Sequence, residues 1–295
     1  MGKIRTCCFS EKAIKVSDNS CVGASNQDSQ ALQNRVVCVY KTKLSTQNQV
    51  FITVTWCNNI DRQGLSVTVA NNPSSTLKVD TNSGYYGTKK GKQTVESNSS
   101  KIDFCWDLTL AKYDKGPEPV DDYYVAVVLD SELGLFIGDV KKFTTCCIPV
   151  ARFSLVSRRE HYSGNALYST KVKFEGKGKI YDIVVKCSGQ GEGLKYPVLS
   201  VSVDKRVVIH VEKLHWNFRG RQEIYLGGLM IDVLWDIHGL LCNPESGVAV
   251  FMFQTKSVCS WWLLPEKEEQ QKDVYSFVIY GSTSTHVRAH REIGR

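Results

Sequence analysis

Two stretches of this sequence match each other and decide the fold: GKQTVESNSSKIDFCWDL at residues 91–108 and GRQEIYLGGLMIDVLWDI at residues 220–237. Each starts with Gly-x-Gln and ends on an Ile-Asp-x-x-Trp-Asp pattern followed by an apolar residue. In the first copy, Ile102, Phe104 and Trp106 alternate with other residues, and alternation places side chains on one face of a strand. The match therefore predicts a strand with an inward-facing tryptophan, present twice.

Three more stretches recur in the same order along the chain. Residues 41–57 match residues 171–187, residues 65–69 match 199–203, and residues 125–127 match 248–250. The offset between the copies ranges from 123 to 134 residues, which is typical of loop insertions between strands that keep one order. We interpret the chain as a duplicated module, because four matches in one order are hard to obtain by chance.

The repeated units are mainly β in character. Val, Ile, Thr and Tyr are frequent in both, and residues 44–50 and 175–178 read as hairpin turns. Helix signals are limited to short turns after Asp107 and Asp236 and a charged segment at 265–272. We expect two tandem homologous antiparallel modules, each a sandwich or an open barrel, with few short helices. The predicted divisions are a flexible lead (1–33), module 1 (34–149), module 2 (150–255) and a C-terminal extension with a short helix, a last strand and a frayed tail (256–295).

Composition indicates a soluble intracellular protein. The chain has 295 residues, of which 42% are hydrophobic and 23% charged, as in ordinary globular proteins. It has no apolar run long enough to span a membrane and no apolar core of a secretory signal at its start. Its cysteines number eleven and none forms a C-x-x-C pair, so we expect reduced thiols.

Several strings of this sequence resemble a plant family catalogued as domain of unknown function 868. They are RVVCVYKTKL, ITVTW, GLSVTV, FCWDLTLAKY, GPEPVDDYYVAVV, SLVSRREH, WNFRGRQ and VLWDIHGLL, spread from about residue 35 to about residue 280. One departure is the stretch GYYGTKKG at 84–91, where the family often has a Trp-rich segment. The resemblance implies a plant source and an intracellular β-rich protein, and it implies no activity.

Motifs for catalysis, cofactors and metals are weak. The sequence has no G-x-S-x-G motif, its histidines are scattered, and Cys146-Cys147 are strand neighbours that would point to opposite faces. Gly189-x-Gly191-x-Gly193 is followed by Lys-Tyr-Pro and a strand, and lacks the helix that a phosphate loop needs. The repeated Asp103/Asp107 and Asp232/Asp236 pairs suit a solvent-facing and a turn-capping role. We therefore predict no catalytic, cofactor-binding or metal-binding residues.

Positive charge concentrates early in the second copy. Residues 151–221 contain 14 basic and 6 acidic residues, a net charge of +8. The candidate anion-binding surface consists of Lys171, Lys173, Lys177, Lys179, Arg219 and Arg221. Such a surface could attract RNA or an anionic lipid, although lysines on a strand edge also serve to prevent edge-to-edge pairing.

The N-terminus fits a lipidation motif. Met1-Gly2-Lys3-Ile4-Arg5-Thr6 matches the pattern for myristoylation of Gly2, and Cys7 and Cys8 follow as candidates for palmitoylation. The prediction is cytoplasmic residence, with membrane association if these residues are acylated.

Three function classes remain open from the sequence. The first is a non-enzymatic binding or scaffold protein with a protein partner. The second is a nucleic-acid or anionic-lipid binding protein that uses a basic face of module 2. The third is an enzyme with a cleft between the two modules. The sequence names no ligand, partner or oligomeric state.

Overall fold

A computed structural model describes residues 30–59, 62–69, 76–80, 89–97, 100–139, 148–174, 178–188, 197–243, 246–256 and 274–282. These residues form nineteen strands and one short helix. In chain order they are β1 (Leu32–Lys43), β2 (Gln49–Asn59), β3 (Arg62–Val69), β4 (Thr76–Asp80), β5 (Lys90–Ser97), β6 (Ser100–Asp107), β7 (Lys112–Tyr113), β8 (Pro119–Asp121), β9 (Tyr124–Leu129), β10 (Glu132–Gly138), β11 (Arg152–Ser163), β12 (Leu167–Lys173), β13 (Ile180–Ser188), β14 (Val198–Val203), β15 (Arg206–Val211), β16 (Arg219–Leu226), β17 (Leu229–Asp236), α1 (His238–Cys242), β18 (Val248–Thr255) and β19 (Ser276–Ser282).

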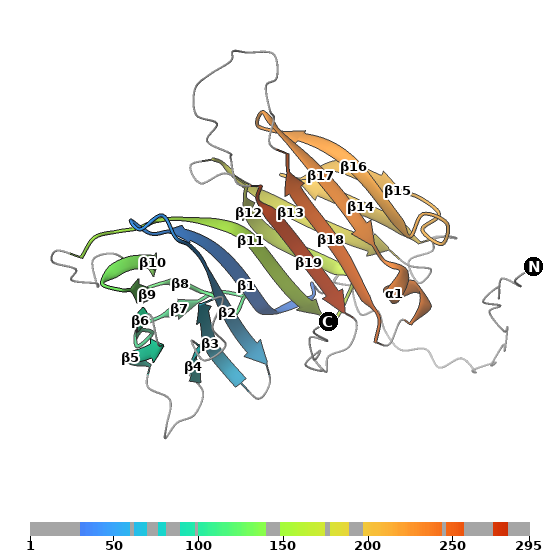
Figure 1. Ribbon diagram of the computed structural model, residues 1–295. Helices are drawn as coiled ribbons and strands as arrows, with labels where there is room; N and C mark the ends of the chain where they lie inside the picture. The colour runs from blue at the N-terminus through green and yellow to red at the C-terminus, as the bar shows by residue number, and fades with distance from the viewer. Residues whose placement is uncertain are drawn as a thin grey trace, which may run out of the picture.

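One nine-stranded sheet runs through the molecule. Its strand order is β16-β17-β18-β19-β11-β1-β2-β3-β4, and Figure 1 shows it crossing the view from β16 at upper right to β4 at lower left. Two four-stranded sheets, β10-β9-β6-β5 and β12-β13-β14-β15, and the β7-β8 pair complete the described fold. The predicted mainly β, antiparallel fold is confirmed. Each sheet has two edge strands, and none of the described sheets closes into a barrel.

The two halves of the chain repeat one strand order. β1-β2-β3-β4 corresponds to β12-β13-β14-β15, and β5-β6-β9-β10 corresponds to β16-β17-β18-β19. The matching tryptophans occupy equivalent places, because Trp106 on β6 pairs with Gly91 on β5, and Trp235 on β17 pairs with Gly220 on β16. Both tryptophans are buried. The β5–β6 and β16–β17 pairs thus have the same register, as the repeated sequence predicts.

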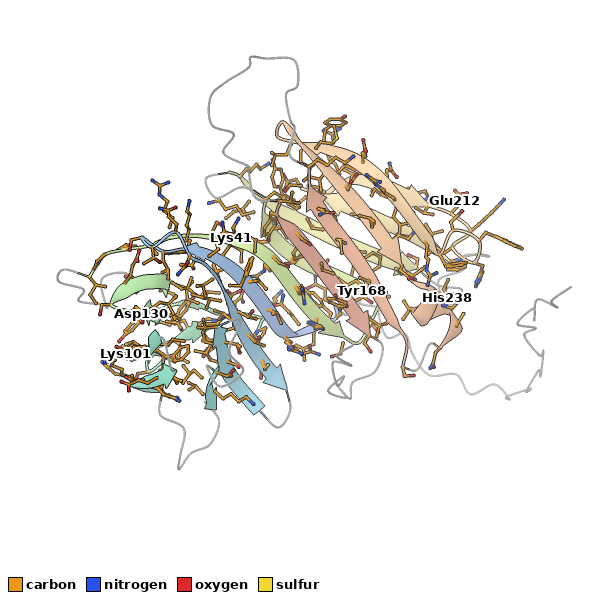
Figure 2. All side chains as sticks on the ribbon, viewed as in Figure 1. Lys41, Lys101, Asp130, Tyr168, Glu212 and His238 are labelled. Atoms are coloured by element: carbon orange, nitrogen blue, oxygen red, sulfur yellow. The ribbon has the colours of Figure 1, made fainter. Side chains whose placement is uncertain are left out.

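A single row of paired residues crosses all nine strands on one face of the large sheet. The row is Val79, Leu65, Trp56, Val36, Glu160, Ile279, Phe251, Trp235 and Gly220. Its members from β1–β4 pack against β5, β6, β9 and β10, and its members from β17–β19 pack against β12–β15. Both small sheets therefore cover the same face, and Figure 2 shows Tyr168 among the side chains of the second core.

Strand β11 joins the two sandwiches and has no counterpart in the repeat. It pairs antiparallel with β1 and parallel with β19, so the first half of one module continues into the second half of the other. β19, which the sequence assigns to a C-terminal extension, lies between β18 and β11 and supplies Phe277 and Ile279 to the second core. The predicted boundaries at 33/34, 149/150 and 255/256 stay a prediction.

A turn follows the first of the two repeated aspartates, and the short helix α1 follows the second. Asp107 accepts a hydrogen bond from the Thr109 N–H (3.1 Å), and Asp236 accepts one from the His238 N–H (3.0 Å) at the start of α1. Both are turn-capping contacts, as the sequence pattern predicts. The helix predicted at 265–272 lies outside the described residues.

Candidate functional site on the open sheet face

The predicted anion-binding residues divide between two sheets. Lys171 and Lys173 lie exposed on β12, flanking the buried Val172, and so point away from the second core. Arg219 and Arg221 lie on β16, in the nine-stranded sheet. The structure does not bring these two groups together. Lys177, Gly2, Cys7 and Cys8 lie outside the described residues.

Three of the six predicted basic residues are also neutralised by ion pairs. Arg219 binds Asp236 (2.8 Å), Arg221 binds Asp232 (2.6 Å), and Lys179 binds Asp204 (2.5 Å). The first two pairs repeat in the first module, where Lys90 binds Asp107 (3.0 Å) and Lys92 binds Asp103 (2.9 Å). The repeated carboxylates thus hold neighbouring strands together across the outer faces of the sandwiches. That role suits two copies of a structural feature.

A buried charged cluster lies on the covered face of β11, where the two sandwiches meet. Arg158 Nε binds Glu160 Oε1 (2.7 Å), and Arg158 Nη1 binds Glu118 Oε2 (2.8 Å) and contacts Cys38 Sγ (3.5 Å). The Tyr162 hydroxyl donates to Glu160 Oε2 (2.8 Å). Glu160 has no exposed surface, so its charge depends on these partners. We call these five residues the junction cluster.

The junction cluster does not form an activated nucleophile. Burial raises the pKa of the Cys38 thiol to about 12, against the lowering effect of Arg158. Burial opposes the charged form of Arg158, but Glu118 and Glu160 outweigh it and raise the Arg158 pKa. The thiol is therefore protonated and the guanidinium charged at neutral pH, an arrangement that stabilises the junction and leaves Cys38 a poor nucleophile.

The opposite face of the nine-stranded sheet is open, because the described strands place no second layer over it. At its centre lie two arginines, Arg35 on β1 and Arg159 on β11, and both are exposed. Arg35 pairs with His161, and Arg159 is two residues before His161 on the same strand. Diagonal neighbours of this kind are roughly 7–8 Å apart, and somewhat less at Cβ, which puts both guanidinium groups within reach of one shared ligand group. Neither arginine makes an ion pair with a carboxylate in the described part of the chain.

His161 and Tyr280 form the edge of this arginine pair. Their rings stack with centroids 4.6 Å apart and an interplanar angle of 11°, across the parallel pairing of β11 with β19. Burial, Arg35 and Arg159 lower the pKa of His161 to about 4. The imidazole is therefore neutral at physiological pH, and the two arginines supply the positive charge of this region. We call Arg35, Arg159, His161 and Tyr280 the central site.

Apolar side chains continue the open face across the second module. In the row that contains Arg159 the neighbours are Val37, Val278, Met252, Leu234 and Arg221. Val37 and Val278 are only 7% and 3% exposed, while Met252 and Leu234 are half-buried. The same face of the first module carries Thr53, Thr55, Ser66 and Thr68 instead. The two halves of the open face thus differ in chemistry: Val278, Met252 and Leu234 are apolar on β17–β19, and β2 and β3 carry the hydroxyl groups.

Other chemistry-bearing groups are isolated. On α1, His238 Nε2 and Cys242 Sγ lie 3.4 Å apart, and no carboxylate of the described residues contacts the His238 ring. This ring packs on Phe218, with the two ring centroids 5.2 Å apart. Within the described residues, no three or more His, Cys, Asp or Glu side chains gather as metal ligands would. The five described cysteines, at 38, 57, 105, 187 and 242, are free. No helix in the described ranges combines the length and apolar character of a membrane span.

Comparison with known families fits this picture of a fold with no recognised chemistry. The model of a family described as "Plant protein of unknown function (DUF868)" matches residues 31–292. The chain belongs to this family. The resemblance read from the sequence strings is therefore confirmed, and the DUF868 family has no assigned function. Neither the curated proteins nor the solved structures that were compared with the chain gave a match.

The central site was not predicted from the sequence, although one signal pointed to it. Arg158-Arg159-Glu160 places three consecutive charges inside a strand that a duplicated β module would bury. Alternation sends Arg158 and Glu160 to one face and Arg159 to the other. Only the order of strands in the DUF868 fold shows that the first face is covered and the second open.

Proposed function

We propose that this protein is a non-enzymatic binding protein whose ligand-binding surface is the open face of the nine-stranded sheet. The observation that carries the proposal is that both small sheets cover the same face, which leaves one continuous face shared by the two modules. A sheet face that only meets water is normally polar. The half-buried Met252 and Leu234, which are paired across β18 and β17, depart from that rule and support a binding role.

The experiment compares ligand capture by the wild type and by two matched double variants, using affinity purification from plant tissue and mass spectrometry. Leu234→Gln/Met252→Gln makes the open face polar without adding charge. Ile180→Gln/Val207→Gln makes the same kind of change at exposed apolar residues of β13 and β15. The proposal expects a partner that is lost with the first variant and kept with the second. A partner retained by both variants, each with a wild-type melting temperature, would contradict it.

The junction cluster argues against the enzyme alternative as stated from the sequence. The groups between the modules are bound to one another, and the one thiol among them is protonated because burial raises the pKa of Cys38 to about 12. The alternative of a basic face on module 2 also loses support, since Arg219 and Arg221 are bound to Asp236 and Asp232.

For localisation, we propose that the protein resides in the cytoplasm and is held at a membrane when Gly2 is myristoylated and Cys7 or Cys8 palmitoylated. The support is the sequence motif together with the need for two anchoring signals. Fractionation of plant cells that express wild type, Gly2→Ala or Cys7→Ser/Cys8→Ser tests it. We expect the variants to move from the membrane to the soluble fraction. Identical partitioning of all three would show that these residues carry no anchor.

A further inference from the structure

We infer that Arg35 and Arg159 together bind a phosphate group on the open face, with the stacked rings of His161 and Tyr280 at its edge. This inference rests on the proposed function and names the ligand chemistry for that surface.

Charge balance on the open face points to this position. Around β16 and β17, every described basic side chain has an acidic partner: Arg219 with Asp236, Arg221 with Asp232, and Lys256 with both Glu223 and Asp232. At the centre the pattern stops, because Arg35 and Arg159 face no described carboxylate. Two neighbouring like charges without a counterion are unfavourable, and a bound anion would relieve that repulsion.

The geometry favours phosphate over a single carboxylate. A guanidinium presents a planar fork of donors that matches phosphate oxygens, and two guanidiniums on adjacent strands match the charge of a dianion. Arg35 and Arg159 project from paired strands in a fixed register, with His161 directly opposite Arg35. Three side chains surround the His161 ring: Arg35 of β1, Arg159 of β11 and Tyr280 of β19. No carboxylate of the described residues lies among these four side chains.

The neutral imidazole provides a built-in reporter of binding. Arg35 and Arg159 help to keep His161 unprotonated, so an anion that screens these arginines must raise the His161 pKa. The expected response is specific, because an anion bound elsewhere on the molecule would leave this titration unchanged.

The test titrates inorganic phosphate, and in parallel sulfate, into the full chain while NMR follows the His161 ring. Sulfate keeps its charge between pH 4 and 7, whereas phosphate changes its protonation near the top of this range. A shift of the His161 pKa that sulfate also produces therefore comes from binding and not from titration of the ligand. We expect a rise in the His161 pKa with either anion, and a loss of affinity of about tenfold or more in Arg35→Gln and in Arg159→Gln. Added sodium chloride should weaken binding further. Lys171→Gln/Lys173→Gln is the matched control on the small sheet.

A second arm identifies the source of the phosphate group. Flotation with phosphatidylcholine vesicles, with and without phosphatidic acid, measures binding to a lipid headgroup. Vesicle binding that Arg35→Gln and Arg159→Gln abolish assigns the site to a phospholipid, and binding of free phosphate alone assigns it to a soluble phosphate ester. The inference is overturned if neither probe changes the His161 titration, or if the control variant loses affinity as much as the arginine variants. Such a failure leaves the Leu234/Met252 capture experiment untouched, so the two ideas fail separately.

Discussion

Gly220 lies directly opposite Trp235 across β16 and β17, and a Cβ at residue 220 would come within 2.1 Å of the indole ring. The first module repeats the arrangement, since a Cβ on Gly91 would lie 2.7 Å from the Trp106 ring. The sequence feature Gly-x-Gln followed by Trp-Asp is therefore a packing motif in which each tryptophan covers a glycine on the neighbouring strand.

Substitution of either glycine should destabilise its module. We expect Gly220→Ala and Gly91→Ala to lower the free energy of unfolding by about 1–3 kcal/mol, because a methyl group would displace a buried ring. Gln222→Ala, at an exposed position of the same strand as Gly220, should change it by less than about 0.5 kcal/mol. Urea unfolding measures all three, and equal stability of the glycine and glutamine variants would refute the motif.

Substitution of a tryptophan should cost stability in proportion to the burial of its side chain. Trp235 is 9% exposed, and its Nε1–H donates to the Asn217 carbonyl (3.1 Å), whereas Trp216 is 82% exposed. We expect Trp235→Ala to cost about 3–5 kcal/mol of stability. Trp216→Ala should stay within about 0.5 kcal/mol of wild type. Thermal unfolding provides the comparison, and a neutral Trp235→Ala would show that this ring is not part of the core.

The junction cluster should show strong coupling between its charges. Arg158→Met leaves Glu160 buried without its main partner and should cost about 3–5 kcal/mol. Arg158→Met/Glu160→Met removes both charges and should recover most of that loss. A double-mutant cycle in urea, completed by Glu160→Met, measures the coupling. Additive losses would mean that the two side chains do not depend on each other.

His161 should make the protein less stable as the pH falls. Its pKa is lowered from 6.5 to about 4, so between these values the unfolded chain binds more protons than the folded one. Stability due to this group is complete above about pH 6.5 and declines towards pH 4, by at most about 3 kcal/mol. His161→Phe keeps an aromatic ring against Tyr280 and should flatten this part of the curve. Unfolding measured at intervals from pH 7 to 4 tests the sign, and an unchanged slope in the variant would contradict it.

The sequence by itself determined the repeated unit. Alternation in Ile102–Trp106 and in its partner Ile231–Trp235 defined which side chains face a core, and the matching Gly-x-Gln stretches defined the neighbouring strand. These features are local, since a period of two fixes the face of every residue in a strand once one is known to be buried. The turn-capping aspartates could be predicted for the same reason, because Asp107 and Asp236 act on residues two positions away.

Only the tertiary structure decided how the two units meet. No periodicity reveals that β11 pairs with β1 on one side and in parallel with β19 on the other, because these partners are distant in the sequence and pairing depends on the assembled sheet. That pairing brings Arg35, Arg159, His161 and Tyr280 together, and it assigns Lys171 and Arg219 to different sheets. Net charge over a stretch of chain says how many basic residues there are. Which of them keep an uncompensated charge depends on the carboxylate across the strand, and the fold alone sets that neighbour.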